Sequence, residues 1–265
     1  MDSTFYFHLG LSFVVGGLWV TISTIIAEKY GSKIGGLIGG LPSTAAVALL
    51  FIGITQTPLI ASESTTIVPI AQGLNGIFMI VFILFSRRGL VAGMGCALLV
   101  WSLQATFLVL TGIHDLWISI FGWMLLVSGS YIIVEKVMHI PSRGSVSVRY
   151  SRSQILFRAI FSGAVISFAV FMGRMGGPMF GGIFATFPGM FISTLIITYL
   201  SGGSDFSRAI AKSMMVSGTV NVGFYAIAIR YTYPIMGLLF GTIVALLFSC
   251  LTGYATYLFI SKKVA

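Results

Sequence analysis

Long apolar runs separated by short polar stretches extend over nearly the whole chain. A helix that crosses the hydrocarbon core of a bilayer needs about 20 apolar residues. Runs of about this length predict nine membrane-spanning helices, at about residues 5–27, 34–55, 64–86, 89–111, 116–135, 155–173, 178–200, 209–230 and 234–260. The pattern therefore predicts an all-α polytopic membrane protein.

The positions of the basic residues predict the orientation of the chain. All but two of the 15 Lys and Arg residues follow the first, third, fifth, seventh or ninth span, and only Arg174 and Arg230 fall on the other side. Because cytoplasmic loops carry an excess of Lys and Arg, we expect the N-terminus outside and the C-terminus in the cytoplasm of an inner-membrane protein. The basic loop from His139 to Gln154 is then expected to contact anionic lipid headgroups.

The sequence repeats itself at a shift of 146 residues without gaps. The matched pairs are Gly17/Gly163, Gly31/Gly177, Gly35/Gly181, Gly36/Gly182, Pro42/Pro188, Leu49/Leu195, Asn75/Asn221, Phe78/Phe224, Gly95/Gly241 and Thr106/Thr252. We expect one four-helix repeat in residues 1–112, a linker helix and basic loop in 113–154, and a second repeat in 155–265. One extra span between the repeats inverts the second, and inverted repeats are an architecture of transporters.

The stretches GSKIGGLIGGLP (31–42) and GPMFGGIFATFP (177–188) place glycine and proline inside predicted spans. Proline removes a helix hydrogen bond and kinks the chain, and glycine leaves the backbone free to adopt other angles. Transporters place such interrupted helices at their midplane sites. The glycines also have the small-xxx-small spacing that packs helices together without any ligand. Both interpretations stay open.

Polar residues at depth are the candidate site. Asn75 and Asn221 fall at the centres of equivalent spans, where each carboxamide either bonds a neighbouring helix backbone or lines a polar site. The other candidates for this pathway are Pro42, Ser43, Thr44, Gln72, Gln104, Thr186 and Pro188. Glu28 and Arg174 are equivalent and oppositely charged, but about 30 Å of hydrocarbon separates them, which leaves only a weak gating role.

Composition excludes several classes of protein. A mean hydropathy of +1.03, with 57% hydrophobic and 8% charged residues, does not suit a soluble domain. The net charge of +9 reflects membrane orientation and not nucleic-acid binding. No metal-ligand cluster, cofactor motif or catalytic motif is present, so no metal, cofactor or enzymatic activity is expected. The scarcity of charge within the spans favours a neutral or weakly polar solute.

The segments GGIFATFPGMFISTLIITYLSGG (181–203) and SRAIAKSMM (207–215) resemble the GlpM-like family of small four-span bacterial membrane proteins. The first half is a weaker copy, with Leu41 where the second half has Phe187. The resemblance implies a fused duplicate of a four-span inner-membrane unit, with no assigned activity. The architecture is also similar to the small multidrug-resistance and drug/metabolite transporters, whose units pair antiparallel, so a homodimer is compatible with it. Small multidrug-resistance transporters use a glutamate in the first span, and Glu28 lies near the end of that span.

These observations predict a transporter that moves a small solute by alternating access at a midplane site. The alternative is a membrane protein that does not transport but acts as a scaffold or interacts with lipid. In that case every glycine and proline would serve helix packing.

Overall fold

The computed structural model describes residues 2–29, 41–140 and 150–264. Within these ranges the chain is helical and contains no strand, which confirms the prediction of an all-α protein. Five helical stretches are long and apolar enough to cross a membrane: Ser3–Ile26, Val68–Arg88, Leu90–Thr111, Leu116–Val137 and the bent stretch Arg152–Ala255. The prediction of several apolar helices long enough to cross a membrane is therefore confirmed.

The first half contains α1 (Ser3–Lys29), α3 (Ser43–Thr55), α4 (Pro58–Ser64), α5 (Val68–Phe85) and α6 (Leu90–Thr111). A 3-10 turn, η1 (Ser86–Arg88), joins the last two. The separate helix α4 differs from the predicted span 64–86. It begins at Pro58, where the Thr57 side chain accepts a hydrogen bond from the Ile60 amide at 3.1 Å. A proline at the first position of a helix and a capping hydroxyl before it start a new helix.

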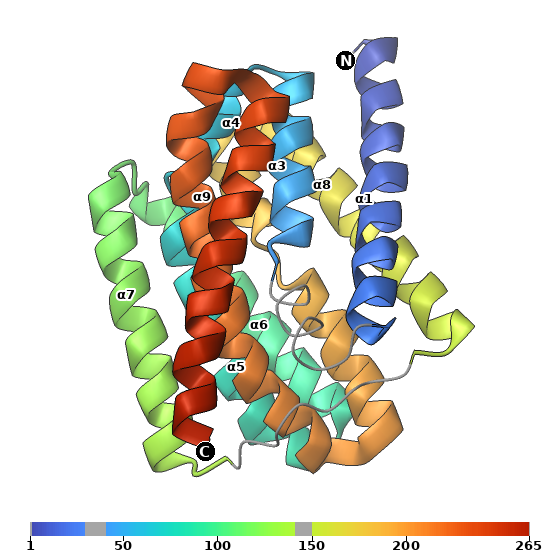
Figure 1. The fold of residues 1–265 in the computed structure, drawn as a ribbon, viewed down its shortest axis with the longest axis vertical. Coiled ribbons are helices and arrows are strands. Elements are labelled where there is room, and N and C mark those ends of the chain that lie inside the picture. Colours follow the sequence, from blue (N-terminus) through green and yellow to red (C-terminus); the bar gives the residue numbers. More distant parts are fainter. Residues whose placement is uncertain (1, 30–40, 141–149, 265) are drawn as a thin grey trace.

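The second half follows α7 (Leu116–Ile132) and the π-helical turn η2 (Ile133–Val137), and consists of α8 (Arg152–Ala185) and α9 (Gly189–Val264). The predicted spans leave short loops at about residues 174–177, 201–208 and 231–233. Instead, single glycines bend the helices there, with φ of 78° at Gly177, 77° at Gly203 and 72° at Gly237. Only glycine adopts such angles without strain. Figure 1 shows α9 folding back on itself between its orange and red parts.

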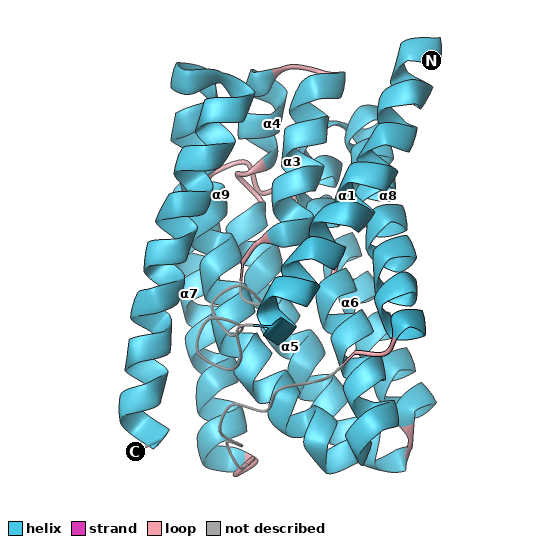
Figure 2. Ribbon diagram, turned by 45° about the vertical axis from the view of Figure 1, so that its right-hand side comes forward, coloured by secondary structure: helices cyan, strands magenta, loops and turns pink. Residues whose placement is uncertain are grey.

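The helices form one elongated bundle (Figures 1 and 2). The two ends of the chain lie at opposite ends of this bundle. One buried cluster joins α5 and α6 to α9, and a second joins α3 to α8 and α9. Large apolar side chains such as Leu103, Leu125 and Leu247 are exposed on the outside of the bundle, where lipid would cover them.

Helices α1 and α8 pack against each other through glycine. A Cβ atom built on Gly17 would lie 2.9 Å from the Ala159 carbonyl oxygen, and one built on Gly163 would lie 2.6 Å from the Phe13 carbonyl oxygen. Glycine allows two helix backbones to approach this closely. The two contacts are also related by the sequence repeat, because Phe13 and Ala159, like Gly17 and Gly163, are 146 residues apart.

Lys212 of α9 is nine-tenths buried and anchors the end of α7. Its Nζ lies 2.6 Å from Glu135 Oε2 and donates to the Ile140 carbonyl at 2.6 Å. We expect Lys212→Met to lower the free energy of unfolding by about 1–3 kcal/mol, because a buried carbonyl and a half-buried carboxylate both lose their donor. Thermal unfolding in detergent measures the change.

The matched variant for this prediction is Glu135→Gln. It leaves Lys212 bonded to the Ile140 carbonyl, so we expect it to destabilise the protein less than Lys212→Met does. An equal or larger loss in Glu135→Gln would show that the ion pair, and not the anchoring of the chain after α7, dominates this contact.

Candidate functional site

Two helices begin in the same way at equivalent prolines. Helix α3 starts after Pro42 and α9 starts after Pro188. In the first, the Ser43 amide donates to the Leu41 carbonyl at 2.7 Å and the Ala46 amide to the Pro42 carbonyl at 2.7 Å. In the second, the Gly189 amide donates to the Phe187 carbonyl at 2.7 Å and the Ile192 amide to the Pro188 carbonyl at 2.8 Å. Every one of these positions is related to its counterpart by the shift of 146 residues.

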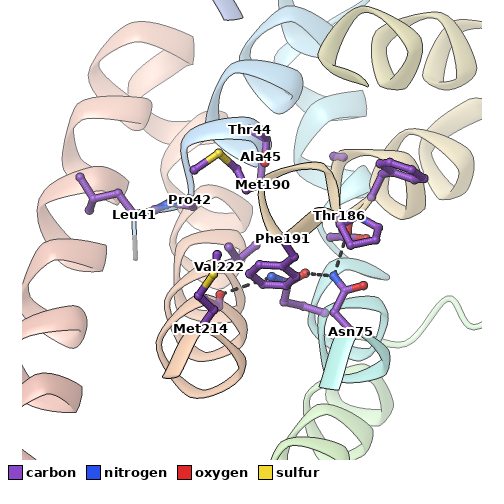
Figure 3. Close-up of a pocket in the computed structure, with 15 residues that line it drawn as sticks. Leu41, Pro42, Thr44, Ala45, Asn75, Thr186, Met190, Phe191, Met214 and Val222 are labelled. Carbon is purple, nitrogen blue, oxygen red and sulfur yellow. Dashed lines mark hydrogen bonds between the residues drawn. The ribbon is translucent and has the colours of Figure 1, made fainter. Parts of the chain in front are cut away.

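The break between α8 and α9 is held by Asn75 of α5. Helix α8 ends at Ala185, and Asn75 Nδ2 donates to the Thr186 carbonyl at 2.9 Å and to Gln72 Oε1 at 2.7 Å (Figure 3). Gln72 Nε2 in turn donates to the Gly218 carbonyl at 3.3 Å. The carboxamides thus satisfy backbone carbonyls that the broken helix and its neighbour expose, which would otherwise be costly in an apolar bundle.

A pocket lies between these helix breaks (Figure 3). It is small and partly open to the outside. Helix α5 contributes the two carboxamides, and the starts of α3 and α9 contribute the opposite walls. The lining residues are Leu41, Pro42, Thr44, Ala45, Gln72, Asn75, Ala185, Thr186, Phe187, Pro188, Met190, Phe191, Met214, Gly218 and Val222.

The electrostatic field at the pocket is set by helix ends. The N-termini of α3 and α9 both line it, and each carries a partial positive charge from unbonded amide groups. A proline precedes each helix, and proline offers no side-chain oxygen to cap these amides. Helix α3 accordingly has no capping bond from a side chain in the described structure.

Arg158 of α8 adds a full positive charge beside the pocket. Its side chain is 5% exposed, and its guanidinium donates to Thr194 Oγ1 at 2.9 Å and Tyr150 Oη at 3.2 Å. It also contacts Met190 Sδ, a lining atom, at 3.4 Å. None of the carboxylate side chains that the structure describes pairs with Arg158, and its Nε has no hydrogen-bond partner among the described residues. Buried cations are usually paired, so this charge is unusual.

The structure gathers six of the predicted pathway residues around the pocket: Pro42, Thr44, Gln72, Asn75, Thr186 and Pro188. The other three do not line it. Ser43 is buried next to Thr44, Gln104 lies on α6, and Asn221 is buried on α9 where its carbonyl accepts from Ser249 at 3.5 Å. Equivalent positions in the sequence therefore do not contribute equally to the pocket.

The remaining predictions concern the weak gating role of Glu28 and Arg174 and the glycine-rich stretch 31–42. Arg174 is exposed on α8, near the bend at Gly177. The Glu28 side chain and the first ten residues of the glycine-rich stretch 31–42 lie outside the described residues. Among the described residues, no group of three or more His, Cys, Asp and Glu side chains gathers closely enough to hold a metal ion.

Sequence reasoning missed Arg158 and the apolar lining residues Met190, Phe191, Met214 and Val222. Arg158 was assigned with the basic residues after the fifth span, because nothing in the local sequence distinguishes a buried arginine from one at the interface. The apolar residues look like any lipid-facing or core residue. The signal for Gly218 was available, because it is the repeat counterpart of Gln72.

Comparison with known proteins gives a family without an assigned role. A family model described as "Protein of unknown function (DUF3147)" matches residues 9–114, the segment from α1 to the end of α6. No curated protein and no solved structure matches the chain.

Proposed function

We propose that the protein is an integral membrane transporter that moves a small solute by alternating access. It consists of two inverted four-helix units joined by α7, which together cross the inner membrane nine times. The solute binds in the pocket between the starts of α3 and α9. The observation that carries this proposal is that two equivalent broken helices begin at one pocket, with Asn75 between them.

Contacts between equivalent positions support the inverted repeat. A two-fold axis brings each position near it into contact with its own counterpart, as in a symmetric dimer. Gln72 and Gly218 are such a pair, 146 residues apart and hydrogen-bonded. Away from the axis, contacts come in reciprocal pairs, as Gly17 with Ala159 and Gly163 with Phe13 do.

The extent of the family match supports a four-helix unit. The match ends at residue 114, close to the boundary at residue 112 that the repeat predicts. The bends at Gly177, Gly203 and Gly237 divide the second half into stretches that correspond to four further spans. The two ends of the chain lie at opposite ends of the bundle in Figure 1, which agrees with an odd total number of spans. The excess of basic residues then orients the C-terminus toward the cytoplasm.

The helix breaks support a solute site. Non-helical backbone at membrane depth is tolerated where it lines a cavity or is buried in protein, and transporters use it to bind solutes. The starts of α3 and α9 lie well inside the bundle in Figures 1 and 2, away from both ends.

A scaffold or lipid-binding role is the second candidate. The close glycine contacts between α1 and α8 favour it, because such contacts pack helices with no ligand involved. The two functions differ in one property. A transporter must open its pocket to water on each side in turn, whereas a scaffold need not open it at all.

Cysteine accessibility distinguishes the two functions without knowledge of the solute. Met214 lines the pocket, and its neighbour Met215 is 2% exposed in the core and does not. In a background where Cys96 and Cys250 are replaced by alanine, we expect Met214→Cys to react with a small water-soluble thiol reagent from either side of a proteoliposome membrane. Met215→Cys is the control and should react from neither side.

Reaction of Met214→Cys from one side only would contradict alternating access. It would indicate instead a binding protein, or a pocket that is permanently open to one side of the membrane. Lack of reaction from both sides would favour the scaffold. Equal reaction of Met214→Cys and Met215→Cys would show general loosening of the bundle, and the accessibility would then not report a pathway.

A further inference from the structure

The pocket presents two groups of backbone donors that no side chain in the described part of the chain is seen to cap. The amides of Thr44 and Ala45 open α3, and those of Met190 and Phe191 open α9. Amides at these positions point out of the helix start and have no acceptor within the helix. Two helix N-termini that face one small space form a site for a negatively charged group, because their dipoles add there.

The guanidinium of Arg158 strengthens this preference from behind the wall of the pocket. The guanidinium contacts a wall of the pocket directly, since Arg158 Nη2 lies 3.4 Å from Sδ of the lining residue Met190. Among the acidic side chains that the structure describes, which do not include Glu28, none neutralises this charge. A buried cation without a counter-ion is stabilised when an anion occupies the adjacent space.

Asn75 supplies a second and different requirement. Its side chain is 1% exposed and lines the pocket, and its Nδ2 is fully used on Thr186 and Gln72. Its Oδ1 is buried and has no hydrogen-bond partner among the described residues. A buried acceptor of this kind is satisfied by a donor on a ligand, and a ligand without one leaves it unpaired.

The geometry points to a small carboxylate that also carries a hydroxyl or ammonium donor as the solute of this pocket. The carboxylate would bind at the helix starts, the donor would face Asn75 Oδ1, and the short carbon skeleton would lie against Phe191 and Val222. This inference rests on the proposed transport function and narrows its substrate. It differs from the neutral or weakly polar solute that the sequence predicts. That prediction took the scarcity of charged side chains into account, but not the dipoles of the broken helices.

Ligand protection of the Met214→Cys protein tests the inference. The rate of thiol modification is measured with lactate, propionate or lactamide at equal concentration and ionic strength. Lactate has both the charge and the hydroxyl, propionate lacks the hydroxyl, and lactamide is a neutral compound of the same shape. Inorganic phosphate is added as a fourth probe, because it is an anion with donors but no carbon skeleton.

We expect lactate to slow modification most. Loss of one hydrogen bond to Asn75 should weaken apparent binding of propionate about fivefold relative to lactate. Lactamide should protect at least about tenfold less well than lactate, because charge-assisted bonds to helix ends are lost. Arg158→Gln should reduce protection by lactate and leave the weak effect of lactamide unchanged.

Equal protection by lactate and lactamide, or no protection by any anion, would overturn the inference. Protection by phosphate in preference to lactate would overturn the assignment of a carboxylate. None of these results affects the transport proposal if Met214→Cys still reacts from both sides of the membrane. Conversely, if Met214→Cys reacts from one side only and lactate still protects it, the site binds a carboxylate but does not transport it.

Discussion

Replacement of Asn75 by leucine is expected to lower the free energy of unfolding by about 2–4 kcal/mol and to abolish solute binding. The leucine would leave the Thr186 carbonyl and Gln72 Oε1 buried without their donor, and each buried polar group left unpaired costs about 1–3 kcal/mol. The break between α8 and α9 would then lose the contact that holds it. Thermal unfolding in detergent and protection of Met214→Cys by lactate measure the two effects.

Gln104→Leu is the matched control for this change. Gln104 is also a mid-span carboxamide, but it lies on α6 away from the pocket, and its Oε1 has no hydrogen-bond partner in the described part of the chain. Because leucine removes a buried acceptor that has no partner, we expect this replacement to leave stability unchanged or to raise it, and to leave protection intact. A neutral or stabilising effect of Asn75→Leu would mean that the carboxamide does not hold the break, and the site would lose its central residue.

The second large effect is expected at the crossing of α1 and α8. A methyl group on Gly163 would come within 2.6 Å of the Phe13 carbonyl oxygen, a backbone atom that cannot move without its helix. We therefore expect Gly163→Ala to lower the free energy of unfolding by about 3 kcal/mol or more, or to prevent recovery of folded protein. Size-exclusion profiles and thermal unfolding in detergent report both outcomes.

Gly129→Ala on α7 is the comparison, because nothing lies within 4 Å of the added carbon there. Alanine favours the helix over glycine by about 0.8–1 kcal/mol, so this variant should be as stable as the parent or slightly more so. Similar losses in both variants would show that the close crossing does not determine the effect, because Gly129 has no such crossing and helix propensity favours alanine at both positions. Full stability of Gly163→Ala would contradict the observed approach of the two backbones.

The sequence predicted the helical architecture because apolar runs of membrane length are a strong signal. It also predicted part of the site. Proline and asparagine in the middle of a span are costly in a membrane unless neighbouring groups satisfy the polar atoms that they leave exposed. Asn75, Pro42 and Pro188 lie around one pocket for this reason. The shift of 146 residues also makes Gly218 the counterpart of Gln72, a relation that the sequence prediction did not use, and these two residues are hydrogen-bonded.

Other features depend on tertiary packing and could not be predicted. Arg158 is buried by neighbours on α9 and by Tyr150, none of which its local sequence reveals. The turns at Gly203 and Gly237 were expected as loops, because single-glycine bends and short polar loops look alike in sequence. The failure of Asn221 to line the pocket shows that a repeat in sequence does not fix which copy contributes to a site.

The central claim is that the two halves have opposite orientations in the membrane, and side-specific labelling of one equivalent pair tests it most directly. Leu59 and Asp205 are 146 residues apart and both exposed, with 59% of Leu59 and 76% of the Asp205 side chain accessible. In the background without native cysteines, Leu59→Cys should react with a membrane-impermeant maleimide in intact cells. Asp205→Cys should react only after the membrane is permeabilised. Reaction of both cysteines from the same side would contradict the inverted repeat and, with it, the transport mechanism proposed for the pocket.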